Sequence, residues 1–485
     1  MCIKKIIYKT FLLLFLCVFF IVWGKVLFGD VIYKYNTIIL ILYMSAGIGV
    51  ILAVYKFIAR RAAIIKKHYK SILAVFLTLY GIIILINSFL LRFTPAFDMD
   101  AVYSGAVQWV KQGSFPDYYE YFGYFPNNIG AMVVLHTIFS IVSVFGISDF
   151  FAVGAVFNSL LITATVMVVS LVCRKLKGEA AGVMALVFFM VYIPFMFMGA
   201  AFYTDSLSLL FPVLFYYLYI YFKEQVTWKK RALFASGMAL VLTIGMLIKF
   251  TVVIILFAVI IDALLTIGWK EVCLLTGFSL ILAFVSFNIM DLYMYSKHLD
   301  KNTSKQLNTP YLHWVMMGLQ NNGAYSYEDY EYTRSFAAED RNKACLSKIK
   351  ERINNMGFAG FTELLLNKAD VCFGDGTLSI SDFLDDSPYK YRWIHQYILY
   401  SGAKHYQYKH FVTGILLGIY LFMLRWAAIC LKGKNTSKDI VLAPVLAGLG
   451  ILAFLLLWET RGRYFTNFVP VLLVCAAISF NWEKQ

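Results

Sequence analysis

The chain has 485 residues, of which 61% are hydrophobic and only 15% are charged. Apolar runs of about 20 residues recur along most of its length, which excludes a soluble protein and predicts an all-α, polytopic membrane protein. The formal net charge of +15 could suit a nucleic-acid-binding protein. Because the Lys and Arg residues lie in short loops between apolar runs, as the positive-inside rule requires, we predict contact with a lipid bilayer and no nucleic acid.

The first three predicted helices set the orientation of the chain. They cover approximately residues 6–24, 37–57 and 71–91. The first has a basic start and no small-residue cleavage site, so we interpret it as a retained helix, with a signal peptide as the alternative. The segment 56–70 is strongly basic and is therefore predicted to be cytoplasmic, so the third helix carries the chain outward.

Three later loops, 174–179, 223–231 and 431–439, are also basic and are predicted to be cytoplasmic. Helix counts from the two ends of the chain agree only if one apolar segment fails to cross the membrane. We assign this role to 129–147, which contains His136, and expect it to lie along or dip into the outer interface. The chain then crosses about 12 times, or 13 times if this segment spans and one basic loop is misplaced.

This topology divides the chain into N-terminal transmembrane helices, a first outer loop with interfacial helices, a transmembrane core, an outer helical segment and C-terminal transmembrane helices. The N-terminal helices cover 1–91, the first outer loop 92–150 and the transmembrane core 151–290. The outer helical segment covers 291–410, and the C-terminal helices cover 411–485. The outer segment is polar, and helical spacing in 337–358 predicts a small helical cap. Any chemistry is expected on the extracytoplasmic face, where no ATP is present, so an activated substrate must arrive on a lipid.

Two carboxylates, Asp98 and Asp100, follow directly after the third predicted helix. The sequence supports two interpretations of this pair. Either residue can cap the helix that begins here, a common role for Asp, or one can point into a cleft as a catalytic acid or base. Because residues two apart do not share a helical face, only one of them is expected to reach the cleft.

A second charged cluster lies in "WETRGRY", which contains Glu459, Arg461, Arg463 and Tyr464 at the outer end of an apolar helix. Arginine on this side of the membrane runs against the positive-inside tendency, so an anion is expected to hold it there. The anion can be a protein carboxylate, in an internal Arg–Glu pair, or a lipid phosphate in a phosphate clamp.

Three further groups of polar residues are ambiguous. Lys249 lies between two apolar runs and can either snorkel to the outer surface or face the cleft proposed for the aspartate pair. Asp205 can either cap the helix that follows it or face that cleft. The outer histidines show no metal-binding spacing, so ordinary packing is favoured; they are His298, His313, His395, His405 and His410. The eight cysteines include no CxxC pair, which indicates neither a zinc site nor a disulfide framework.

The order of these motifs resembles that of the GT-C superfamily of membrane glycosyltransferases, specifically the bacterial family 39 that includes protein O-mannosyltransferases and aminoarabinose transferases. The resemblance extends over nearly the whole chain. Its motifs are "FDMDAVYSGA", "YFPNNIG", "FYTD", "IKFT", "HWVMMGL" and "WETRGRY", in this order. Many relatives carry adjacent acids in the first motif, whereas Met99 separates them here. Asp98 rather than Asp100 fits the Asp-x-x-x-x-Tyr pattern, which ends at Tyr103.

The resemblance implies an enzyme of a bacterial cell membrane that moves a sugar from a polyprenyl-phosphate donor to an extracytoplasmic acceptor: a wall polysaccharide, a teichoic acid or a protein. Asp98 would act as the base of an inverting single displacement, and Arg461, Arg463 and Lys249 would neutralise the lipid phosphate. The remaining predicted substrate contacts are Tyr103, Asn127, Asn128, Asp205, His313, Trp314, Glu459 and Tyr464.

The implied reaction requires no cofactor, because cationic side chains can neutralise a monophosphate, although a divalent metal bridging Asp98 and the phosphate is an alternative. The implied partner is an upstream polyprenyl-phosphate glycosyltransferase that makes the donor. Two other functions remain open. The first is a ligase or polymerase of lipid-linked oligosaccharides, and the second is a lipid or sugar transporter, which the absence of a clear internal repeat disfavours.

Overall fold

The computed structural model describes residues 2–29, 33–384, 392–433 and 441–480. All regular structure in these residues is helical, without a β-strand. Nine stretches of this part of the chain are long and apolar enough to cross a membrane. They contain α1 (Cys2–Phe28), α2 (Thr37–Arg60), α3 (Ala62–Leu90), α6 (Ile129–Ser143), α7 (Phe150–Lys177), α10 (Leu210–Glu224), α11 (Trp228–Ile248), α13 (Trp269–Lys297) and α19 (His405–Lys432).

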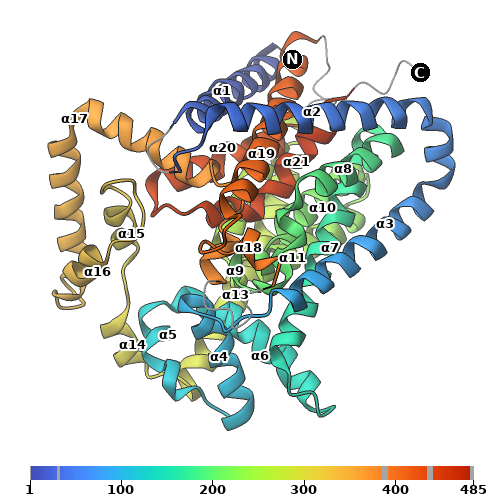
Figure 1. Cartoon of the computed structure of the whole chain (residues 1–485). Helices are drawn as coiled ribbons and strands as arrows, with labels where there is room; N and C mark the ends of the chain where they lie inside the picture. Colours follow the sequence, from blue (N-terminus) through green and yellow to red (C-terminus); the bar gives the residue numbers. More distant parts are fainter. Residues whose placement is uncertain (1, 30–32, 385–391, 434–440, 481–485) are drawn as a thin grey trace.

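Four shorter apolar stretches complete the bundle in Figure 1. They contain α8 (Glu179–Val191), α12 (Val253–Thr266), α20 (Leu442–Leu457) and α21 (Val469–Ala477). Buried α19 packs against α1, α2 and α21, whereas α11 packs on α13 and α12 on α20. The prediction of an all-α, polytopic membrane protein is therefore confirmed.

The first outer loop returns to its starting point. It contains α4 (Phe97–Gln112), η1 (Pro116–Tyr118), α5 (Tyr119–Tyr124), η2 (Pro126–Asn128) and α6. Arg92 Nη1 lies 2.6 Å from Asp149 Oδ2, so the residues that precede α4 and follow α6 are joined by an ion pair. This closure is the geometry expected if 129–147 does not carry the chain across. Since α6 also satisfies the criteria for a span, the number of crossings stays a prediction.

The cap predicted in the outer segment is present, and Figure 1 shows it to one side of the bundle. It consists of α14 (Lys301–Leu307), α15 (Tyr311–Met317), α16 (Tyr327–Arg334) and α17 (Arg341–Phe373). The cap has a small apolar core of its own, made of Met316, Leu319, Cys345, Ile349 and Leu364. The predicted helix over 337–358 forms the first half of α17, which bends at Gly357, where φ is +60°, a value that glycine adopts readily.

The rest of the outer segment is not part of the cap. Residues 374–384, which include η6 (Ile380–Phe383), are nearly all buried, and α18 (His395–Ile398) then leads into α19. Asp375 organises this segment, because its carboxylate accepts hydrogen bonds from the backbone N–H and hydroxyl groups of Thr377 and Ser379. The segment returns to the bundle and packs against the turn that contains Gly462.

Short breaks interrupt the bundle at the end where α3 ends and α7 begins, which we call the site end. The breaks are η3 (Ile193–Met196), η4 (Met198–Ala200) and α9 (Thr204–Leu207) before α10, η5 (Phe250–Val252) before α12, and η7 (Gly462–Phe468) before α21. In each case a helix stops and another starts within a few residues. The breaks therefore leave backbone groups without partners inside a helix and place polar side chains, most of them buried, between the helices.

Candidate active site

Three of these breaks bring together side chains that lie far apart in sequence. Asp205 comes from α9, Lys249 from the junction of α11 and η5, and Arg463 from η7. Asp205 Oδ1 pairs with Lys249 Nζ, and its Oδ2 lies 3.8 Å from Arg463 Nε. All three side chains are at least 88% buried, so the charges must compensate one another inside the protein.

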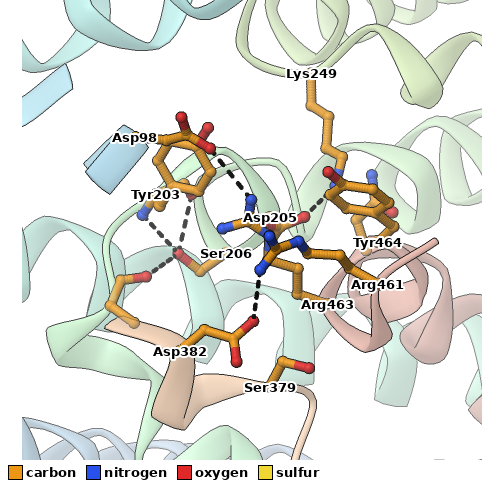
Figure 2. Close-up of polar contacts among 12 residues, drawn as sticks. Asp98, Tyr203, Asp205, Ser206, Lys249, Ser379, Asp382, Arg461, Arg463 and Tyr464 are labelled. Atoms are coloured by element: carbon orange, nitrogen blue, oxygen red, sulfur yellow. Dashed lines mark hydrogen bonds and ion pairs between the residues drawn. The ribbon is translucent and has the colours of Figure 1, made fainter. Parts of the chain in front are cut away.

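Asp98 adds an accessible carboxylate to this cluster (Figure 2). Its Oδ2 lies 3.3 Å from Arg463 Nη2, and its Oδ1 accepts a hydrogen bond of 3.0 Å from the Tyr121 hydroxyl. Its side chain is 39% exposed. Asp98 lies in the first turn of α4, but α4 has no side-chain N-cap, so the capping interpretation is wrong for both aspartates.

A second layer of hydrogen bonds holds Tyr121 in place. The Asn128 amide donates to the Tyr121 hydroxyl at 2.6 Å and accepts from the Tyr203 hydroxyl at 3.2 Å. Asn127 donates to the same Asn128 oxygen. The "YFPNNIG" motif therefore supports Asp98, with Asn128 at the centre of the network and Asn127 at its exposed edge.

Arg461 is the most accessible of the three cations in the site. Its side chain is 36% exposed and lies 3.4 Å from Glu459 Oε1 and 3.7 Å from Asp382 Oδ2. The Tyr464 hydroxyl donates to Glu459 at 2.9 Å, and the Tyr400 hydroxyl donates to Asp382 at 2.5 Å. The internal Arg–Glu pair of the alternative interpretation is thus present, and it leaves one face of Arg461 accessible.

Burial changes the acidity of these two carboxyl groups. It raises the pKa of Glu459, an effect that Arg461 and the Tyr464 hydrogen bond oppose. It also raises the pKa of Asp382, and here the Tyr400 hydrogen bond and both arginines oppose it. Both groups are therefore closer to accepting a proton than exposed carboxylates are.

A small cavity lies beside Arg463. The residues that line it include Tyr203, Asp205, Ser206, Phe383 and Thr466. Segment 374–384 forms one wall, and the Gly462 backbone approaches it so closely that a Cβ atom there would lie 2.7 Å from Ser379 Oγ. The Arg463 guanidinium also lies over the Phe383 and Tyr203 rings, at 5.0 and 5.3 Å.

A buried lysine connects the cap to the site. Lys368 of α17 donates to the carbonyl oxygens of Gly318, at 2.8 Å, and Trp458, at 2.7 Å. Thr460 N–H also donates to Gly323 O at 2.8 Å. Burial lowers the pKa of Lys368 to about 8, and Cys372 and Glu459 oppose this shift. The loop after α15 is therefore fixed to the residues that carry Glu459 and Arg461.

Two of the predicted site residues lie apart from the cluster. Asp100 accepts hydrogen bonds from Ser104 at 2.6 Å and Tyr118 at 3.2 Å, which gives it a structural role in α4. Tyr103 packs among aromatic rings, which are those of Phe139, Phe151 and Phe202. Among the described residues, neither side chain forms an ion pair or a hydrogen bond with Arg461 or Arg463. The geometry thus places Asp98, and not Asp100, beside an arginine of the cluster.

The two predicted cap residues differ in accessibility. His313 is fully buried and its Nδ1 lies 2.7 Å from Thr333 Oγ1; burial lowers its pKa to about 4, so the ring is neutral near pH 7. Trp314 lies between Phe125 and Trp458, with ring centroids 6.0 and 6.5 Å away. Trp314 is therefore placed to line the approach to the site, whereas His313 supports the cap interior.

Sequence reasoning missed Asp382, Tyr203 and Lys368. Asp382 lies in a polar segment that contains several acids, and no local pattern distinguishes it from its neighbours. The sequence predicts that the Asp and Arg motifs share the outer face, and it leaves open whether they meet in one cluster. Among the described residues, no group of three or more His, Cys, Asp and Glu side chains could hold a metal ion.

The fold and the charged cluster define a polytopic integral membrane protein with a polar site at one end of its helical bundle. The chain belongs to the family described as conserved hypothetical integral membrane proteins, whose model matches residues 1–484. No curated protein matches the chain.

Proposed function

We propose that the protein is a GT-C-type glycosyltransferase that moves a sugar from a polyprenyl-phosphate donor to an extracytoplasmic acceptor. The observation that carries this proposal is the ion pair between accessible Asp98 and Arg463, in the same short turn that carries the accessible Arg461. A base next to a pair of arginines suits a reaction in which an alkoxide attacks and a phosphate departs. The positive-inside rule supports a site on the outer face, because the basic loops lie at the opposite ends of α3, α7 and α11.

In the proposed reaction, the acceptor hydroxyl oxygen attacks the anomeric carbon while the bond between that carbon and the phosphate oxygen breaks. Asp98 receives the hydroxyl proton, and the electron pair of the broken bond leaves with the polyprenyl phosphate. Arg463 and Tyr121 orient Asp98 from two sides. Arg461 would neutralise the leaving phosphate, because it is the site cation with the most accessible side chain.

The experiment is a transfer assay with the purified protein in lipid nanodiscs and radiolabelled polyprenyl phosphates carrying mannose, glucose or galactose. Release of polyprenyl phosphate is measured with a cell-envelope extract as the source of acceptors. Asp98→Asn should lower the rate by about a hundredfold or more, the usual contribution of a general base. Asp100→Asn is the matched control and should have a much smaller effect, since Asp100 contacts only Ser104 and Tyr118 through its side chain.

A normal transfer rate for a correctly folded Asp98→Asn variant would show that Asp98 is not the general base. Accumulation of intact sugar lipid inside sealed vesicles, with no cleavage of the glycosidic bond, would instead identify a transporter.

A further inference from the structure

Each cation of the site already faces a carboxylate. Lys249 pairs with Asp205, Arg463 lies beside Asp205 and Asp98, and Arg461 lies beside Glu459 and Asp382. Within these ion pairs three cations face four carboxylates, so none of the three cations is left without an anionic partner. A bound lipid phosphate must therefore replace one of these carboxylates as a partner of an arginine.

Asp382 is the carboxylate that is most easily replaced. Its 3.7 Å separation from Arg461 exceeds the range of a hydrogen bond, whereas Asp98 is hydrogen-bonded to Arg463 and Glu459 to Arg461. Arg461 is also the most accessible of the three cations. Figure 2 shows Asp382 and Asp98 approaching the arginines from different sides. Asp382 therefore stands where an anion that reaches the open face of Arg461 would bind.

Tyr400 keeps the Asp382 carboxylate close to this position. Its hydroxyl donates to Asp382 Oδ1, which leaves Oδ2 directed at Arg461. Because the Asp382 side chain is 19% exposed, its charge is only partly screened by water. A lipid monophosphate brings fewer negative charges to this carboxylate than a lipid diphosphate does, and each additional charge raises the free-energy cost of binding.

We infer that Asp382 is a specificity-determining residue, which makes the site accept lipids with a single phosphate and disfavour lipids with a diphosphate. This inference rests on the proposed function and names its donor class. It also separates the proposed enzyme from a ligase or polymerase that uses diphosphate-linked oligosaccharides. Once the phosphate takes the place of Asp382 as a partner of Arg461, the displaced carboxylate stays nearby and repels each further negative charge, which disfavours the diphosphate.

The test measures binding of undecaprenyl phosphate and undecaprenyl diphosphate to the full chain in nanodiscs. The wild-type protein should bind the monophosphate more tightly. Asp382→Asn, which keeps the side-chain shape, should reduce this preference by about tenfold, mainly through tighter binding of the diphosphate. Asp382→Glu keeps the charge and should retain the preference. Asp340→Asn removes an exposed carboxylate at the start of α17 and is the matched control.

An unchanged ratio of the two dissociation constants in Asp382→Asn would overturn the inference. A loss of affinity for both lipids would also overturn it, because Asp382 would then serve to position Arg461. Failure of the wild-type protein to bind either lipid would instead reject the proposed function, and this inference with it. If Asp382→Asn does not fold, Asp382→Ser provides the same removal of charge and is judged by the same ratio.

Discussion

Arg461 differs from the two other cations of the site in having an accessible face. Lys249 and Arg463 have side chains that are 12% and 8% exposed and pair with buried Asp205, whereas Arg461 is 36% exposed. A phosphate that enters the site would thus contact Arg461 first. The other two cations would not contact the phosphate directly; they would fix the positions of Asp205 and Asp98.

Replacement of Arg461 by Ala should therefore weaken binding of a polyprenyl phosphate. Loss of a charged hydrogen bond is worth about 1.5–3 kcal/mol, which corresponds to a change of about ten- to a hundredfold in the dissociation constant. Arg461→Lys should recover part of the affinity, since it keeps the charge but loses the paired donors. Lipid binding in nanodiscs measures both effects, and Lys350→Ala on the exposed face of α17 is the control. Equal affinity in Arg461→Ala and the control would argue against the clamp.

Gly462 is needed for the close approach of η7 to segment 374–384. A Cβ atom at this position would lie 2.7 Å from Ser379 Oγ and 2.9 Å from Asp375 Cβ. We expect Gly462→Ala to lower the free energy of unfolding by about 1–3 kcal/mol, the usual cost of overpacking. Thermal unfolding in detergent measures this effect. Gly49→Ala is the control, because that site in α2 has no neighbour within 4 Å and alanine favours a helix; equal unfolding midpoints would contradict the expectation.

At the scale of elements, Lys368 joins three parts of the chain that are separate in sequence. One ammonium group binds the carbonyl that follows α15 and the carbonyl at the end of α20, while its own backbone belongs to α17. Lys368→Met would leave both carbonyls without this donor. We therefore expect weaker attachment of the cap and a lower rate of transfer.

The contribution of Lys368 to stability should depend on pH in a defined direction. Its pKa is lowered from 10.5 to about 8 in the folded protein, so between these values the unfolded chain binds more protons than the folded one. Stability of the wild type relative to Lys368→Met should accordingly rise as the pH increases from 8 to 10, by at most about 3 kcal/mol. Thermal unfolding of both proteins across this range measures the difference. A flat or falling difference would contradict the lowered pKa. Lys348→Met is the control, because Lys348 is a partly exposed residue of α17 that pairs with Glu351.

The elements illustrate what sequence can and cannot predict. Apolar runs identified the membrane helices, because the length of a span is set by the bilayer, and helical spacing identified the first half of α17. The pairing of Asp98 with Arg463 depends on contacts across 365 residues, which no local pattern encodes. The sequence predicts a shared outer face for these two residues. Their proximity, the breaks η5 and η7 and the buried path of 374–384 required the three-dimensional structure. Asp382 was missed for this reason.

At the scale of the whole molecule, charge is separated between the two ends of the bundle. The basic loops lie at the start of α3, the end of α7 and the start of α11, whereas the site lies at the opposite ends of these helices. Such separation gives the chain one favoured orientation in a membrane. The carboxylates and arginines of the site lie at one end of the bundle and compensate one another in ion pairs. A charged site is therefore compatible with a chain that is otherwise mostly apolar.

Cysteine labelling tests this orientation together with the path of the first outer loop. In a background in which the exposed Cys17 and Cys273 are replaced by Ala, Ser148→Cys should react with a membrane-impermeant maleimide in intact cells. Lys229→Cys should react only after permeabilisation, because it lies in a basic loop at the other end of α11. The ion pair between Arg92 and Asp149 requires Ser148 to lie on the same side as the end of α3. Labelling of Ser148→Cys only after permeabilisation would place the site on the cytoplasmic face, where a reaction that depends on an extracytoplasmic lipid donor could not occur.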